Sequence, residues 1–373
     1  MLKTVPSTST NFSFEKSKPV SIQCRSRIFR RLPFMPFSTL PELTVAPMEG
    51  LTTVVYRRLH AQFFGAADRY YLPFVTPTRE PKFTDRQLRE LAPEANEGIC
   101  AIPQLLTRNA DDFIWAAKAL ADLGYKEVNL NLGCPAGTVT AKGKGSGFLQ
   151  YPTELHSFLC RIFKADLPIA VSLKTRVGYR SPDEFENLVD IYARFPMSRL
   201  IVHPRLKTDL YRGDVRLEVL DKVLSALPMP LGYNGDLITP EDIEKTAVHY
   251  AVAPGGLAEI MVGRALMADP ALFRKVNGGS AASLSEILSF HEALFEAYTA
   301  LFESQKNAMM RMKEYWFFQL CLFGEEGDEA RLKKAASKIF RSKQIPDFGA
   351  AVREAAESFP LRRNARYGWR KPL

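Results

Sequence analysis

Two residues have side chains and positions suited to catalysis. Cys134 follows the apolar run 127–132 in a Gly-Cys-Pro turn. A thiol on such a turn can donate a proton or act as a nucleophile, although a small residue filling a turn is an equally good interpretation. Lys174 ends the apolar run 169–173, where an amine is costly to bury unless it faces an anion. It could contact an electron-rich ring or form a Schiff base with a carbonyl substrate.

A second group of residues has the types that bind phosphate. Gly263-Arg264 comes just before a predicted helix at 265–276, where main-chain N–H groups and a guanidinium attract anions. Asn234-Gly235-Asp236 would supply neighbouring contacts, although an ordinary turn remains the alternative. The glycine-rich segment 143–147 permits close approach of the main chain to a ligand, or serves as the hinge of a lid.

Apolar runs interleaved with helical patterns carry these residues. The eight strand-like runs are 43–47, 70–75, 100–105, 127–132, 168–174, 200–203, 229–234 and 259–262. Helices are predicted at 107–123, 152–164, 182–194, 214–227 and 240–249. This alternation favours parallel strands covered by helices and predicts a (β/α)8 barrel, with an open doubly wound sheet as the alternative. In a barrel the carboxyl ends of the strands meet at one face, so the polar residues would share one mouth.

The strand pattern stops after residue 283. Four helices are predicted beyond it, at 283–304, 307–323, 328–342 and 348–358. The predicted organisation is therefore a basic extension at 1–41, a catalytic barrel at 42–283, a helical domain at 284–360 and a basic tail at 361–373. The extension is typical of a flexible segment, and its composition also resembles an organellar transit peptide.

Charge and composition narrow the classes of function. The net charge of +9 comes mainly from the two ends of the chain, so a high isoelectric point alone is weak support for RNA binding. No apolar run is long enough to cross a bilayer, and no spacing of His, Cys and Asp predicts a metal site. The five cysteines form no CxxC pair, and the cytoplasm is the expected compartment unless 1–41 is a transit peptide.

Together these motifs resemble the tRNA-dihydrouridine synthases of bacterial type. The resemblance runs from about residue 43 to 345 and rests on Ala46-Pro47-Met48-Glu49-Gly50, Asn131-Leu132-Gly133-Cys134-Pro135, Lys174-Thr175-Arg176-Val177-Gly178, Asn234-Gly235-Asp236 and Val262-Gly263-Arg264. It implies an FMN enzyme that reduces the C5–C6 double bond of a uridine in the D-loop of tRNA, with NADPH or NADH as reductant.

The resemblance also implies individual roles. It implies flavin contacts for Pro47, Met48, Glu49, Gln104, Lys174 and His203, and contacts to the flavin phosphate for Asn234, Gly235, Asp236, Gly263 and Arg264. Cys134 would give a proton to C5 while the flavin delivers hydride to C6, and Asn131 would orient the uracil.

Basic residues on the loops after the strands are the predicted contacts to tRNA. Those assigned to the RNA are Lys142, Lys144, Arg176 and Arg205. The helical domain, with residues such as Lys333 and Lys334, would form the second wall of an RNA cleft. A monomer without metal or membrane attachment is expected.

Three other functions fit part of the pattern. A flavin barrel could reduce a small pyrimidine or an enone, and would then need no RNA surface. A barrel could bind RNA without catalysis, or Lys174 could serve a Schiff-base aldolase. A flavin spectrum would separate the last two from the flavin enzymes.

Overall fold

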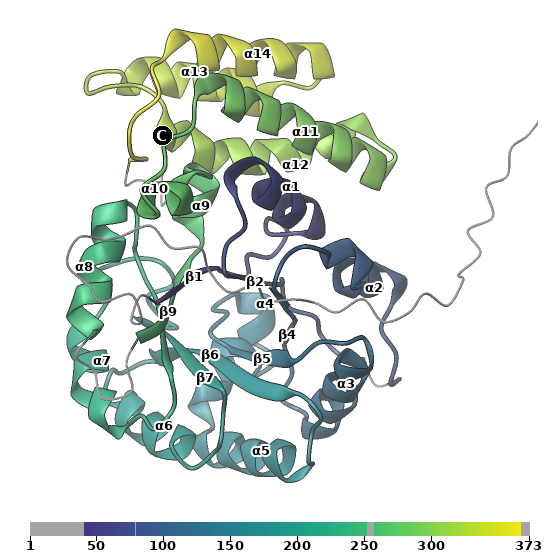
Figure 1. Ribbon diagram of the computed structural model, residues 1–373, viewed down its shortest axis with the longest axis vertical. Helices are drawn as coiled ribbons and strands as arrows, with labels where there is room; N and C mark the ends of the chain where they lie inside the picture. Colours follow the sequence, from purple (N-terminus) through teal and green to yellow (C-terminus); the bar gives the residue numbers. More distant parts are fainter. Residues whose placement is uncertain (1–40, 79, 252–256, 367–373) are drawn as a thin grey trace, which may run out of the picture.

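A closed barrel of parallel strands forms the centre of the computed structural model, which describes residues 41–78, 80–251 and 257–366 (Figure 1). Its strands are β1 (Glu42–Val45), β2 (Arg69–Tyr71), β3 (Ala101–Ile102), β4 (Gln104–Leu105), β5 (Glu127–Leu132), β6 (Ala170–Gly178), β7 (Arg199–Leu206), β8 (Leu231–Asn234) and β9 (Leu257–Val262). They are ordered β3-β2-β1-β9-β8-β7-β6-β5-β4, with parallel pairing throughout.

Pro103 explains why nine strands make an eight-stranded barrel. It separates β3 from β4 and has no main-chain N–H to give to a neighbouring strand. On one side of the break Ala101 pairs with Tyr70, and on the other Gln104 pairs with Asn129. β3 and β4 are thus two halves of one strand that closes the ring. The predicted (β/α)8 barrel is confirmed, and the open-sheet alternative is wrong.

Helices surround the barrel and bury their apolar faces against it. They are α1 (Val54–Phe64), α2 (Asp85–Leu91), α3 (Ala110–Asp122), α4 (Gly137–Thr140), α5 (Pro152–Lys164), α6 (Glu184–Tyr192), α7 (Leu217–Val223), α8 (Pro240–Tyr250), α9 (Arg264–Ala268) and α10 (Leu272–Val276). Short 3-10 turns are η1 (Glu94–Asn96), η2 (Gly145–Gln150) and η3 (Leu224–Ala226). The single helix predicted at 265–276 is wrong, because Pro270 lies between α9 and α10 and cannot continue a helix.

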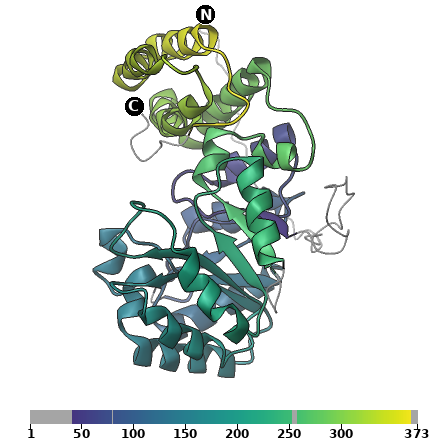
Figure 2. The ribbon, with the colours of Figure 1, turned by 90° about the vertical axis from the view of Figure 1, so that its left-hand side faces the viewer.

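A helical region follows the barrel and lies together at one end of the molecule, away from α5 and α6 (Figures 1 and 2). It comprises α11 (Leu284–Phe302), α12 (Gln305–Gln319), η4 (Leu320–Leu322), α13 (Glu329–Arg341) and α14 (Ile345–Ser358). Ser283 caps α11 in a capping box with Glu286, which fixes where this helix begins. Trp316 is fully buried in the region and donates its indole N–H to Nδ1 of His291 at 3.1 Å.

Residues 360–366 form a strap across this helical region. The amide of Gly324 donates to the carbonyl of Pro360 at 2.9 Å, and the amide of Arg362 donates to that of Leu322 at 2.8 Å. The strap also reaches the barrel, because Nζ of Lys275 donates to the carbonyl of Arg363 at 2.6 Å. The first part of the predicted basic tail is therefore packed against both regions. The predicted extension at 1–41 lies almost entirely outside the described residues.

Candidate active site

A cavity of about 800 Å³ opens at the carboxyl ends of the strands. Loops of the barrel form most of its wall, and Phe318 of α12 adds a side chain from the helical region. Twelve predicted site residues line it: Pro47, Met48, Glu49, Asn131, Cys134, Lys174, Arg176, His203, Asn234, Gly235, Gly263 and Arg264. The thiol and the Gly-Arg pair, 129 positions apart in the numbering, thus share one cavity.

Cys134 lies on a turn that β5 presents to the cavity. The Asn131 side chain caps this turn, because its Oδ1 accepts the amide N–H of Gly133 at 3.0 Å and that of Cys134 at 2.9 Å. Burial raises the pKa of the Cys134 thiol, and the Ala136 amide and the charges of Arg176 and Lys174 oppose this rise. The thiol therefore stays protonated at neutral pH, as a proton donor must.

Lys174 and His203 form the inner wall on β6 and β7. Burial, reinforced by the nearby Arg176 guanidinium, lowers the pKa of Lys174 to about 7. Its Nζ has no hydrogen-bond or ion-pair partner within the described parts of the chain, and a bound anion beside it would favour its charged form. Burial and surrounding cations hold the pKa of His203 well below its usual value. His203 is neutral, and its Nε2 faces Nη1 of Arg205 at 3.1 Å, which makes Nε2 the acceptor and places the proton on Nδ1.

The predicted phosphate-binding residues come together at the ends of β8 and β9. Asp236 is the exception to the prediction, because its carboxylate accepts hydrogen bonds from two arginines instead of facing a phosphate. Its Oδ1 accepts from Nη1 of Arg205 at 2.9 Å and from Nη2 of Arg264 at 2.7 Å. A carboxylate repels phosphate, so Asp236 acts here by holding Arg264 beside the cavity.

Gln104 lies beneath the cavity and does not line it. It is fully buried, and its Oε1 accepts from Nδ2 of Asn131 at 2.7 Å while its Nε2 donates to Oδ1 of Asn129 at 2.8 Å. Nδ2 of Asn129 donates in turn to Oγ of Ser172 at 2.9 Å. The Gln104 amide thus supports Asn131, and the direct flavin contact predicted for Gln104 stays a prediction.

The four basic residues predicted to bind tRNA separate into two kinds. Lys142 is exposed and Lys144 is half-buried, so both can reach a partner in solution. Arg205 is fully buried, and Arg176 is 1% exposed with Nε donating to the carbonyl of Gly133 at 2.9 Å. Arg176 lines the cavity although it is nearly fully buried, whereas Arg205 does not line it, and the substrate contacts predicted for both stay predictions.

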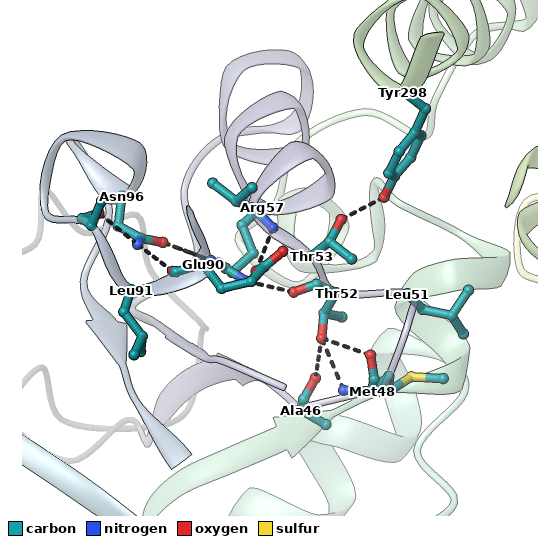
Figure 3. A network of polar contacts seen from close by, with 12 residues as sticks. Ala46, Met48, Leu51, Thr52, Thr53, Arg57, Glu90, Leu91, Asn96 and Tyr298 are labelled. Atoms are coloured by element: carbon teal, nitrogen blue, oxygen red, sulfur yellow. Dashed lines mark hydrogen bonds and ion pairs between the residues drawn. The ribbon is translucent and has the colours of Figure 1, made fainter. Parts of the chain in front are cut away.

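Buried polar groups from several helices hold the loop between β1 and α1, which carries Met48 and Glu49 to the cavity (Figure 3). Nη1 of Arg57 donates to the carbonyl of Thr52 at 2.7 Å, and Oγ1 of Thr53 lies 2.5 Å from the Tyr298 hydroxyl of α11. The Tyr315 hydroxyl of α12 donates to the carbonyl of Leu51. The helical region therefore fixes part of the cavity wall.

Sequence reasoning missed Tyr211, which also lines the cavity. The guanidinium carbons of Arg176 and Arg264 lie 5.3 and 4.9 Å from the centre of its ring, within range of a cation–π interaction. Tyr211 nevertheless remains 45% exposed, which leaves part of the ring open to a ligand. A lone aromatic residue in a loop carries no sequence signal that could have identified it.

The fold and the cavity define the class of protein: a (β/α)8-barrel enzyme with its reactive side chains at the carboxyl face of the barrel. The sequence pattern of the dihydrouridine synthase (Dus) family matches residues 44–359. The chain belongs to this family of oxidoreductases, as its motifs predict.

Bacterial relatives cover most of the chain. A probable tRNA-dihydrouridine synthase of Staphylococcus epidermidis is 27% identical over 88% of this chain and 98% of its own length. tRNA-dihydrouridine synthase B of Pasteurella multocida is 27% identical over 62% of this chain and 67% of its own. Probable tRNA-dihydrouridine synthase 2 of Bacillus subtilis is 27% identical over 77% of this chain and 86% of its own length.

The described residues contain neither a candidate metal site nor a candidate membrane-spanning helix. No group of three or more His, Cys, Asp or Glu side chains there could hold a metal ion. None of the helices described is both long and apolar enough to cross a membrane.

Proposed function

We propose that this protein is an FMN-dependent tRNA-dihydrouridine synthase that reduces the C5–C6 bond of a uridine in the D-loop of tRNA, with NADPH or NADH as reductant. One observation carries the proposal: Cys134, Lys174 and the Gly263-Arg264 pair line a single cavity at the mouth of the barrel. The bacterial relatives are named as tRNA-dihydrouridine synthases, which supports tRNA as the substrate.

The residues that line the cavity fit both the ring and the phosphate of a flavin. Lys174 is a half-buried amine without an anionic partner among the described residues, and it suits the pyrimidine edge of the ring, where negative charge develops. Pro47, Met48 and His203 would hold the ring, while Asn234, Gly235, Gly263 and Arg264 would hold the phosphate. A glycine is favoured at 263 because a Cβ there would lie 3.1 Å from Sδ of Met48, closer than such atoms normally approach. When bound and reduced, the flavin supplies a hydride to C6 of the uracil.

Cys134 would complete the reduction by donating its proton to C5 of the uracil. The raised pKa of its thiol keeps that proton available at neutral pH. Once the proton has left, the positive charges of Lys174 and Arg176 favour the thiolate, because the same charges lower the pKa of Cys134. The Cys134 thiol is thus protonated before the reaction, and the nearby cations stabilise the thiolate that forms when the proton leaves.

The target base must leave its stack to enter the cavity, at a cost of a few kcal/mol. Contacts to the RNA backbone would offset this cost, and candidates for them are Arg212, which lines the cavity, and Lys142 and Lys144, which follow the Cys134 turn in the sequence. Lys333 and Lys334 of α13 are exposed on the helical region, which we propose as the second wall of the RNA site. We propose that the reaction takes place in the cytoplasm.

The visible spectrum of the purified protein is the first test, since oxidised flavin bands are expected and a colourless protein would refute the proposal. A Cys134→Ala variant should retain its flavin and lose turnover on tRNA. Turnover should fall steeply as salt rises, because RNA binding releases counterions. A salt-insensitive reaction on free uracil or an enone would instead identify a small-molecule reductase.

A further inference from the structure

The glycine-rich segment 143–147 does not line the cavity, whereas residues 135–137, which directly follow Cys134, do. Gly145, Ser146 and Gly147 are all buried and form the start of η2. This segment packs directly beneath the thiol turn, defined here as Gly133–Pro135. The close approach of main chain that these glycines permit is therefore an approach to Cys134 itself.

Every main-chain polar group of Gly133 and Cys134 is hydrogen bonded. Asn131 accepts both N–H groups, and Nε of Arg176 donates to the carbonyl of Gly133. The carbonyl of Cys134 accepts from the Ser146 hydroxyl at 2.8 Å and from the Ser146 amide at 3.1 Å. Groups from β5, β6 and η2 thus fix the turn from three sides.

Gly145 closes the remaining space behind the turn. Its φ of +56° is one that side-chain-bearing residues rarely adopt. A Cβ built on it would lie 2.8 Å from the carbonyl oxygen of Cys134 and 3.1 Å from the Cys134 Cβ. A glycine is needed here because the main chain of Cys134 occupies the space that a side chain would take.

We propose that Ser146 is a positioning residue for proton transfer, which fixes the carbonyl of Cys134 and thereby aims the thiol into the cavity. The inference rests on the proposed role of Cys134 as proton donor. Proton transfer demands that donor and acceptor atoms meet within hydrogen-bond distance, and a displacement of about 1 Å can cost a hundredfold in rate. Removing one of two bonds to the carbonyl loosens the turn only in part, so a loss of about tenfold in kcat is expected.

The test is Ser146→Ala in the full-length protein, with Ser198→Ala as the matched control. Ser198 lies just before β7, and its hydroxyl has no hydrogen-bond partner among the described residues. Turnover on tRNA should show kcat reduced about tenfold in Ser146→Ala with KM unchanged, and neither should change in Ser198→Ala. A merely structural role would lower the melting temperature and leave kcat per folded molecule intact, which would overturn the proposal.

Alkylation of Cys134 by iodoacetamide gives a readout that needs neither flavin nor RNA. Mass spectrometry of the Cys134 peptide across pH should show faster alkylation in Ser146→Ala, with its profile moved to lower pH, because a loosened thiol is better solvated. An unchanged profile would refute the positioning role.

Two comparisons separate this inference from the proposed function. If Cys134→Ala retains full turnover, the proton-donor role fails by itself. If Cys134→Ala is inactive while Ser146→Ala matches the unmodified protein in kcat and alkylation, only the positioning role fails. Hydrogen exchange of the unmodified protein needs no variant to fold: the Ser146 amide, which donates to the Cys134 carbonyl, should exchange slowly, and rapid exchange would overturn the proposal.

Discussion

Replacing Arg57 by methionine should remove about 3 kcal/mol from the free energy of unfolding. The Arg57 side chain is fully buried and paired with Glu90 at 3.0 Å. It also donates to Oδ1 of Asn96 at 2.8 Å and to the carbonyl of Thr52 at 2.7 Å (Figure 3). Methionine fills much of the same space but makes none of these bonds, so Glu90 loses its cationic partner while keeping the Val54 amide, and Asn96 and the Thr52 carbonyl lose their bonds to Arg57.

The size of the effect follows from how deeply the pair is buried. Breaking a buried ion pair by removing one partner costs roughly 3–5 kcal/mol, and the lower end applies because the Glu90 side chain is 25% exposed. The matched control is Arg331→Met. The Arg331 side chain is 65% exposed and pairs with Asp328, three residues earlier in the chain. An exposed pair of this kind contributes less than about 1 kcal/mol.

Urea unfolding followed by circular dichroism, with linear extrapolation to water, measures both variants. Arg57→Met should unfold at clearly lower urea, and Arg331→Met should overlay the unmodified protein. Equal midpoints for the two variants would show that the network around Arg57 is solvated or replaceable. The same loop carries Met48, so a fluorescence titration of Arg57→Met should also show weaker flavin binding.

Three further outcomes are expected. Lys174→Met should weaken flavin binding at least tenfold, and binding to the unmodified protein should decline as pH rises above about 7, where the amine loses its charge; fluorescence titration across pH measures both. Burial lowers the pKa of His60 and His291 to about 4, so the unfolded state takes up protons first as pH falls. Stability should thus be complete above about 6.5 and decrease between 6.5 and 4, by about 1 kcal/mol per pH unit for each histidine, whereas a flat profile would contradict their burial. Tyr315→Phe should cost about 1–2 kcal/mol in thermal or urea unfolding, because the Leu51 carbonyl loses its donor, and no change would mean that water replaces the hydroxyl.

Hydrophobic periodicity was sufficient to predict most of the barrel. The strand at 127–132 and the helix at 152–164 have the predicted bounds, because the first is a continuous apolar run and the second opens with a proline at its first turn. The same reasoning could not see that Pro103 divides a strand. It also placed one helix across Pro270, where the apolar pattern continues although the helix does not.

The sequence predicted which residues lie at the site better than it predicted which groups they contact. Strand ends meet at one face of a barrel, so Cys134 and Arg264 could be brought together from the sequence alone. Whether a basic residue at a strand end faces solvent or a buried partner depends on groups distant in the chain. Arg205 illustrates this: its partner Asp236 follows the next strand, and no local pattern joins the two. The contact of Ser146 with the Cys134 carbonyl could not be predicted for the same reason. The expected monomeric state stays a prediction.

The strap at 360–366 has a consequence for how the chain folds during synthesis. The amide of Arg366 donates to the carbonyl of Cys321 at 2.8 Å, so the carbonyls of η4 gain these donors only when residues forty or more positions later have been made. The barrel can form while the chain still emerges from the ribosome, since domains fold as units from the amino end. The helical region can close only after residue 366 has been made. A premature stop at position 359 would release a protein with an assembled barrel and an open flank, the kind of product that cellular proteases remove.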